Sequence, residues 1–383
     1  MEIDIFKTKL RKNETVLALG PESSGNFSVY HRGKVHYCRI LKDLIDDRNF
    51  DNFKKSVLDF LRKAEIKPDI ILTDLHPQYR TTIWGKDLAR KFGAKRVGVQ
   101  HHVAHIFSSV GDKIIQGSSY KIPDKFYGIA CDGTGFGIDG KIWGGEIFEV
   151  KCKKEKVKCI KRIGHLENQV LIGGDLAMRE PARMLISILS ILLNKKEVYN
   201  FVKKYYSRNQ CEALYNQLQE KFNCQETSST ARALDAVSIL LGYSENTRDR
   251  KHGPVLALEK NSTRPYELEP KITYNPEEKN HILLTTPLYQ FLLKNLNRDK
   301  NKLAATAQLY IAQGLYEIVK KIPDTKYQIQ NTFFAGGMAD NKIMAEYLSL
   351  QGFYLSKKIP RGDAGISFGQ IVYYLSGANR FGE

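Results

Sequence analysis

The feature that most constrains the fold is a unit of strand, turn and strand that occurs twice. In residues 16–30, the runs VLALG and FSVY flank the polar turn PESSGN. In residues 126–149, the run FYGIACDGTGFGIDGKIWGGEIFEV predicts a strand that ends at Asp132, a glycine-rich turn, a DGK turn and a returning strand. A repeated unit of this kind predicts a duplicated architecture.

The second unit is unusually rich in glycine. Six glycines fall within thirteen residues, which is more than turn geometry requires: Gly133, Gly135, Gly137, Gly140, Gly144 and Gly145. Backbone N–H groups of such turns bind anions, so the two units are predicted to face one anionic ligand. For the first unit alone, an ordinary hairpin is the simpler interpretation.

The remaining segments alternate between strand and helix patterns. Phe53–Ala64 has one apolar face, as a helix requires, whereas IILTDL and RVGVQ are typical of buried strands. Residues 173–242 are helical in pattern, and the polar residues 260–284 predict a linker or an excursion. We therefore predict an α/β fold. Its boundaries are residues 1–125 for a first α/β lobe, 126–383 for a second, and about 173–325 for a helical insertion within the second.

Charge and apolar patterning limit the classes of protein. Lys and Arg total 59 against 42 Asp and Glu, a net charge of +17 that suits an anionic partner or a lysine-rich surface. The longest apolar run, Met184–Leu193, is far shorter than the roughly 20 residues of a membrane span. The N-terminus has no signal-like apolar region, and the six cysteines form no CxxC pair. We expect a cytoplasmic protein with no membrane segment.

Two histidines could begin a metal site. His101 and His105 are four residues apart at the start of a predicted helix, so that both rings lie on one face. The pair alone is a common accident, and the HExxH pattern of zinc proteases is absent because His102 stands at the glutamate position. Asp132 and Asp363 could complete a His₂Asp₂ set, which suits iron, zinc or manganese.

Three further segments are candidates for ligand contacts, and the second and third each have a structural interpretation as well. The glycine turn of AGGMADN (335–341) lets backbone approach a nucleobase or phosphate. After Gly173 and Gly174, Asp175 could bind ribose hydroxyls or cap a helix. The run KCKKEKVKCIKR (151–162) predicts an edge strand protected by lysines, with an RNA contact as the alternative.

Seven segments, taken in order, resemble the carbamoyltransferase module of the HypF hydrogenase-maturation family. They are TDLHPQYRTT (73–82), VQHHVAHI (99–106), DGTGFGIDGKIWGGEIF (132–148), GGDLAMREPARM (173–184), TSSTARALDAVSILLG (227–242), GGMADN (336–341) and IPRGDAGISFGQ (359–370). The resemblance covers about residues 15–377. It implies the duplicated fold of the actin-like ATPase and sugar-kinase superfamily, with two α/β lobes around a nucleotide cleft.

The resemblance also implies a reaction. In this family carbamoyl phosphate and ATP become carbamoyl-adenylate, and the module transfers the carbamoyl group to the C-terminal cysteine of HypE, for the cyanide ligand of [NiFe]-hydrogenase. The implied ligands of one divalent metal, with iron and zinc as first candidates, are His101, His105, Asp132 and Asp363. The implied contacts to the ATP or AMP moiety are Gly133, Thr134, Gly135, Gly174, Asp175, Gly337 and Asn341.

The sequence departs from the family pattern in several places. Ser24 stands where the family has lysine, His252 precedes Gly253 where the family has Glu-Gly, and GGMADNK replaces GGVFQNR. The family's acylphosphatase, zinc-finger and adenylate-forming segments are not recognised. We therefore expect two partner proteins: a separate adenylate-forming protein that supplies the donor, and a HypE-like protein that accepts the carbamoyl group. Two alternatives are a tRNA threonylcarbamoyl-transferase-like enzyme, with tRNA as partner, and a non-catalytic nucleotide-binding maturation partner.

Overall fold

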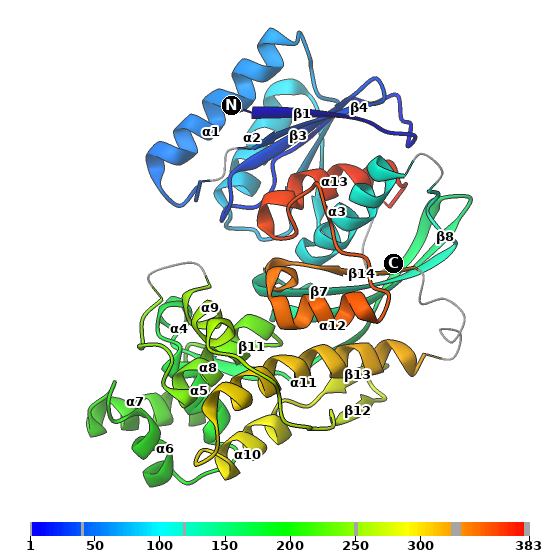
Figure 1. Ribbon diagram of the computed structural model, residues 1–383. Coiled ribbons are helices and arrows are strands. Elements are labelled where there is room, and N and C mark those ends of the chain that lie inside the picture. Colours follow the sequence, from blue (N-terminus) through cyan, green and yellow to red (C-terminus); the bar gives the residue numbers. More distant parts are fainter. Residues whose placement is uncertain (1, 40–41, 118–119, 249–251, 323–330, 379–383) are drawn as a thin grey trace.

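The computed structural model describes residues 2–39, 42–117, 120–248, 252–322 and 331–378 (Figure 1). Two mixed β-sheets form the frame, and two helices lie between them. This arrangement confirms the predicted α/β fold. Among the described residues, no helix has both the length and the apolar character needed to cross a membrane.

The first sheet has the strand order β1-β4-β3-β2-β5-β6. Its strands are β1 (Glu2–Lys7), β2 (Val16–Ala18), β3 (Asn26–His31), β4 (Lys34–Arg39), β5 (Ile70–Asp74) and β6 (Lys95–Val99). Strand β2 pairs antiparallel with β3 and parallel with β5, as a hairpin-headed α/β lobe requires. Helices α1 (Asp47–Lys63) and α2 (Arg80–Phe92) pack on one face of this sheet. Side chains alternate between the two faces of a strand, and Leu17, Phe27 and Val29 point to the face that these helices cover. Strand β1, which pairs antiparallel with β4, was not predicted.

The second sheet is larger, and β7, β8 and β9 are its long strands. Its strands are β7 (Lys125–Phe136), β8 (Ile142–Lys153), β9 (Lys156–Leu166), β10 (Gln169–Ile172), β11 (Cys224–Thr227), β12 (Ile272–Asn275), β13 (Asn280–Leu283) and β14 (Thr332–Ala335). Strand β14 pairs parallel with β7, which pairs antiparallel with β8. The linker expected at 260–284 is wrong in part, because β12 and β13 form a hairpin there and β13 pairs with the end of β9. Since β13 reaches only the last residues of β9, the lysine-rich start of β9 is an edge among the described strands. The single edge strand expected over 151–162 is wrong in part, because β8 ends at Lys153 and β9 begins at Lys156, so that this segment is the tip of a hairpin.

The described residues from 173 to 322 are mainly helical. The helices of this lobe are α4 (Asp175–Arg179), α5 (Ala182–Leu189), α6 (Lys195–Val202), α7 (Arg208–Gln219), α8 (Thr230–Leu241), α9 (Gly253–Lys260), α10 (Thr286–Lys294), α11 (Lys300–Lys320) and α12 (Lys342–Leu350), with short 3₁₀ turns η3 (Gly337–Asp340) and η4 (Asp363–Gly365). The part of the run 184–193 that lies in α5, Met184–Leu189, is buried, whereas Ile191, just after the helix, is exposed.

Helices α3 (His101–Gln116) and α13 (Ile366–Leu375) pack against each other between the two sheets (Figure 1). Close contact requires glycine, because a Cβ at Gly369 would lie 1.9 Å from the carbonyl oxygen of Ala104. Helix α13 comes from the end of the chain, yet it packs on β2 and β3 of the first sheet. It therefore carries the preceding residue Asp363 to the N-terminal end of α3.

Candidate metal and nucleotide site

Helix α3 holds the two predicted histidines side by side. The helix begins at His101, as predicted, and the Gln100 side chain caps it by accepting a hydrogen bond from the Val103 N–H at 2.9 Å. His101 and His105 are one turn apart, and their ring centroids lie 4.9 Å from each other. Both side chains are buried, since α3 is covered on nearly all sides.

A β-bulge places Asp132. The sequence predicted that the strand would end at this residue, but β7 continues to Phe136 and that prediction is wrong. The pairing with β8 jumps from Cys131 opposite Gly145 to Gly135 opposite Trp143. The extra residues form a bulge, which redirects a side chain without ending the strand. Gly144 faces the bulge, and a Cβ there would lie 2.6 Å from the Asp132 carbonyl oxygen.

The turn of the first hairpin holds Asp363. The Ser23 hydroxyl donates a hydrogen bond to the Asp363 carboxylate. Asn26 donates to the Asp363 carbonyl oxygen at 3.1 Å and accepts from the Ser367 N–H at 3.1 Å. The PESSGN turn therefore positions the loop before α13. Ser24, the departure noted in the sequence, contributes a carbonyl oxygen that accepts from Asn26.

The four predicted metal ligands converge. Their ligand atoms all lie within 4.8 Å of one another. Asp132 Oδ2 lies 3.2 Å from Nε2 of both His101 and His105, and Asp363 Oδ1 lies 3.5 and 3.4 Å from the same nitrogens. Ligands about 2.1 Å from one ion are separated by comparable distances. Two imidazoles and two carboxylates also suit a divalent transition metal, so these residues fit such an ion.

The charges of the cluster are strongly coupled. Burial opposes protonation of His101, but the carboxylates of Asp132, Asp363 and Asp74 outweigh it and raise the His101 pKa well above its ordinary value. The pKa of His105 is raised in the same way. Burial and Asp363 oppose ionisation of Asp132, yet the two histidines hold its pKa below the ordinary value. A metal ion at this position would therefore have to displace protons.

Asp74 is a candidate site residue that the sequence reasoning missed. It ends β5, and its Oδ2 accepts a hydrogen bond from His101 Nδ1–H at 2.8 Å. Both groups are buried. A carboxylate at this position fixes the tautomer of the imidazole and directs Nε2 towards the cluster. The sequence signal that could have identified Asp74 is its position at the carboxyl end of a predicted parallel strand, because ligand-binding sites in α/β folds lie at these strand ends.

Two cavities meet at this cluster. One of about 380 Å³ is lined by Ser23, Asp43, Ile45, Tyr79, His101, Asp132, Gly133, Thr134, Met178, Arg179, Arg248, His252 and Asp363. The other, of about 250 Å³, is lined by Asp132, His252, Val255, Leu256, Glu259, Gly337, Met338, Asp340, Asn341, Gly362 and Asp363. Asp132, His252 and Asp363 belong to both linings. A ligand that extends through both cavities would therefore pass the His/Asp cluster.

Four of the seven predicted nucleotide contacts line these cavities. Gly133 and Thr134 line the larger one, and Gly337 and Asn341 line the smaller one. Asn341 Oδ1 also caps α12 by accepting from the Met344 N–H at 3.1 Å. Gly135 lies behind the cluster instead, where a Cβ would lie 2.4 Å from the His102 ring.

Gly174 and Asp175 lie at the start of α4. Gly174, with φ of 56°, occupies the N-cap position, and Asp175 is the first helical residue. Helix capping by the Asp175 side chain, one of its two interpretations, is therefore wrong. Neither residue lines either cavity; α4 contributes Met178 and Arg179 to the larger one. A ribose contact by Asp175 stays a prediction.

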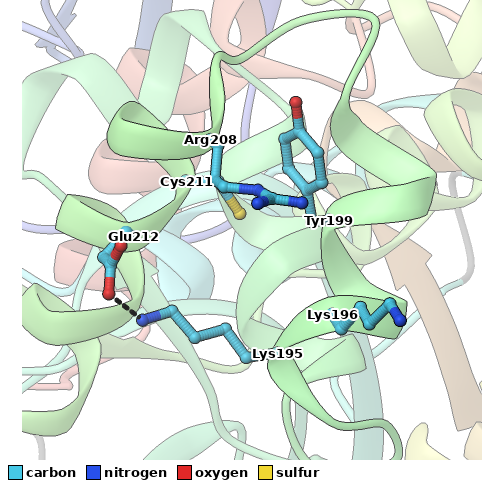
Figure 2. Close-up of a pocket in the computed structure, with 6 residues that line it drawn as sticks. All are labelled: Lys195, Lys196, Tyr199, Arg208, Cys211 and Glu212. Carbon is cyan, nitrogen blue, oxygen red and sulfur yellow. Dashed lines mark hydrogen bonds and ion pairs between the residues drawn. The ribbon is translucent and has the colours of Figure 1, made fainter.

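A separate open hollow of about 510 Å³ lies between α6 and α7 (Figure 2). It is lined by Lys195, Lys196, Tyr199, Arg208, Cys211 and Glu212. Lys195 and Glu212 form an ion pair across it, and it contains none of the predicted site residues.

Two protein-family models match the chain. The family described as "Carbamoyltransferase, Kae1-like Domain, second subdomain" matches residues 128–370, which hold Asp132 and Asp363. The family described as "HypF Kae1-like domain" matches residues 11–112, which hold both histidines. The chain belongs to the HypF carbamoyltransferase family. The resemblance inferred from the seven segments is thereby confirmed.

Individual HypF proteins show the extent of the similarity. "Probable carbamoyltransferase HypF" of Methanocaldococcus jannaschii is 38% identical, over 96% of this chain and 47% of the relative. The crystal structure of T. kodakarensis HypF matches 97% of this chain and 48% of that chain, with 25% identity and a TM-score of 0.83. Full-length HypF in the phosphate- and nucleotide-bound form has the same fold, with 24% identity, 97% and 47% coverage and a TM-score of 0.80. The chain thus spans about half the length of these HypF proteins.

Proposed function

We propose that the chain is a carbamoyltransferase that moves a carbamoyl group from carbamoyl-adenylate to a protein thiol. The acceptor would be the C-terminal cysteine of a HypE-like protein in [NiFe]-hydrogenase maturation. One observation carries the proposal: the buried cluster of His101, His105, Asp132 and Asp363 lies where two cavities meet. An adenylate that extends through both would present its acyl-phosphate bond beside the cluster.

The proposal includes one divalent metal ion, with iron and zinc as first candidates. His101, His105, Asp132 and Asp363 would hold it. When bound, such an ion supplies Lewis-acid polarisation of the acyl group. The protein's own contribution is positioning. Asp74 orients His101, and Ser23 binds the Asp363 carboxylate.

The nucleotide part of the donor would occupy the smaller cavity. Gly337 permits close approach of a ligand because it has no side chain. Asn341 lines the same cavity, and its amide donates to Glu259 and Gln308, which fixes its orientation there. Gly133 and Thr134 would lie near the phosphate. A HypF relative with this fold binds a nucleotide, which supports the same assignment here.

The partners form part of the proposal as well. We also propose that an adenylate-forming protein supplies the donor. The six described cysteines are all free thiols, which supports a reducing, cytoplasmic setting. tRNA is the alternative acceptor, favoured by the net charge of +17. The second alternative is a non-catalytic nucleotide-binding maturation partner.

A reconstituted transfer assay read by mass spectrometry tests the function. It contains this chain, a separate adenylate-forming protein, ATP and carbamoyl phosphate, with HypE and bulk tRNA offered together. A carbamoyl adduct on the HypE cysteine that is lost in the His101→Ala variant supports the proposal. Modified tRNA without that adduct would move the chain to the tRNA alternative. With donor synthesis demonstrated, the absence of both products would refute transfer to either acceptor and favour the non-catalytic alternative.

A further inference from the structure

Arg232 is a buried cation with more donors than partners. It lies in the first turn of α8 and is 2% exposed. Its Nη1 lies 3.0 Å from Asp235 Oδ2, one turn further along the helix. Its Nε and Nη2 have no hydrogen-bond partner among the described residues. Unpaired donors on a buried charged group are costly, so a ligand or water is expected beside them.

Arg248 adds a second guanidinium at the same place. Its Nε lies 3.8 Å from the same Asp235 Oδ2, and its Nη1 donates to the Met178 carbonyl oxygen at 3.4 Å. Burial and the neighbouring Arg232 lower the pKa of Arg248 to about 10. Two cations therefore share one carboxylate, and the group has an excess of positive charge.

This charge lies beside the larger cavity. Arg248 and Gly133 both line that cavity. A Cβ at Gly133 would lie 3.3 Å from Arg232 Nη2, so the absence of a side chain there leaves the guanidinium next to the cavity wall. Ser229, the N-cap of α8, donates to the Asp132 carbonyl oxygen at 3.1 Å and fixes the bulge against this helix.

We propose that Arg232 and Arg248 form an oxyanion site for the phosphate of the nucleotide donor. The proposal rests on the proposed function and deepens it. A guanidinium fork offers parallel N–H donors that match phosphate oxygens, and burial strengthens the interaction. The site would place the phosphate beside the bulge that carries Asp132 and so orient the acyl group towards the His/Asp cluster. Arg232 and Arg248 are thus positioning residues for the donor.

Calorimetric titration of the whole chain with AMP and with adenosine tests the site. Arg232→Lys keeps a charge beside Asp235 but loses the fork, and Arg248→Met removes the second guanidinium. Each is expected to weaken AMP binding by about 10- to 100-fold, the value of a charge-assisted hydrogen bond, while adenosine binding stays unchanged. Arg90→Met, at an exposed arginine paired with Asp87, is the matched control and should bind AMP normally.

Several results would overturn the site. An equal loss of AMP and adenosine binding would assign the arginines to support of the nucleoside pocket. Normal AMP binding in folded variants would make them a structural ion pair. Binding of inorganic phosphate that the variants lose, with no preference for AMP over adenosine, would make the ligand free phosphate. If circular dichroism shows that Arg232→Lys does not fold, the Arg248→Met variant is used for the test, because the Arg248 side chain is less deeply buried. Carbamoyl transfer is measured separately, so a failed transfer assay with intact AMP discrimination would refute the function and leave the anion site.

Discussion

Replacement of Asp74 by asparagine tests whether the cluster is a metal site. The substitution keeps the size of the side chain and its carbonyl-type acceptor for the His101 Nδ1–H, but removes the negative charge. The hydrogen bond is 2.8 Å long and both partners are buried. A hydrogen bond to a charged group contributes about 1.5–3 kcal/mol. Since about 1.4 kcal/mol is a factor of ten, metal affinity is expected to fall about 10- to 100-fold.

The assay is a competition titration with Zn²⁺ and a chromophoric chelator, combined with elemental analysis of the purified protein. Asp74 also helps to raise the pKa of His101. Its loss therefore reduces competition from protons, which favours the metal at low pH. The loss of affinity is accordingly expected to be largest at alkaline pH, where protons compete least.

Asp87→Asn, at an exposed carboxylate on α2, is the matched control and should bind Zn²⁺ as the unchanged chain does. Thermal unfolding of both variants shows whether the fold persists. A folded Asp74→Asn variant with undiminished Zn²⁺ affinity at alkaline pH would refute the reasoning, because the orienting carboxylate would then contribute nothing to the ligand.

Three further predictions concern stability, each checked by denaturant unfolding. Glu146 is buried and accepts from Arg162 Nε; burial opposes its ionisation, but Arg162 and other partners hold its pKa below the ordinary value. The ionised Glu146 therefore stabilises the fold at neutral pH, and this stabilisation is lost as the pH falls below about 4.3. Glu146→Gln should lower the free energy of unfolding by about 3 kcal/mol at neutral pH and by little in acid. An equal decrease at both pH values would contradict this prediction. Asp112 accepts three backbone N–H groups of residues 357–359, and Asp112→Ala should cost about 3 kcal/mol, whereas a cost near zero would mean that water replaces it. Gly336→Ala should prevent folding, because the added Cβ would lie 2.2 Å from the Cys131 carbonyl oxygen. Gly140 also has a positive φ but lies in open space, so Gly140→Ala should lower the free energy of unfolding by only about 1–2 kcal/mol. Similar losses of stability in the two variants would show that the backbone angle, and not the close contact, decides the effect.

Local patterns predicted most individual elements. The apolar spacing in Phe53–Ala64 indicated the core of α1, and the helix that begins at His101 was placed correctly. Strand β1 was missed because its EIDIFK sequence is largely exposed and becomes a strand only through pairing with β4. The hairpin within 260–284 was missed for a similar reason, since polar residues pair there along an existing sheet. Propensity does not register such long-range hydrogen bonds.

The candidate site shows the same division. The sequence by itself determined that His101 and His105 share a helix face, because helical spacing is local. That Asp132 and Asp363 join them was predicted through the family resemblance, and the convergence itself depends on a bulge in β7 and on the packing of α13 against α3. Only the tertiary structure disclosed Asp74 behind His101.

The arginine pair was also decided by tertiary structure. Arg232 and Asp235 lie one turn apart on α8, a spacing that occurs on many solvated helices. Their importance comes from burial and from Arg248, which reaches the same carboxylate from a loop outside α8. Spacing along the chain determines which side chains lie on the same face of a helix or strand. The charged groups that surround those side chains depend on which other elements pack against that face. For this protein, sequence determined the two repeated units and the histidine pair, and packing of the chain's end onto the first sheet decided the site.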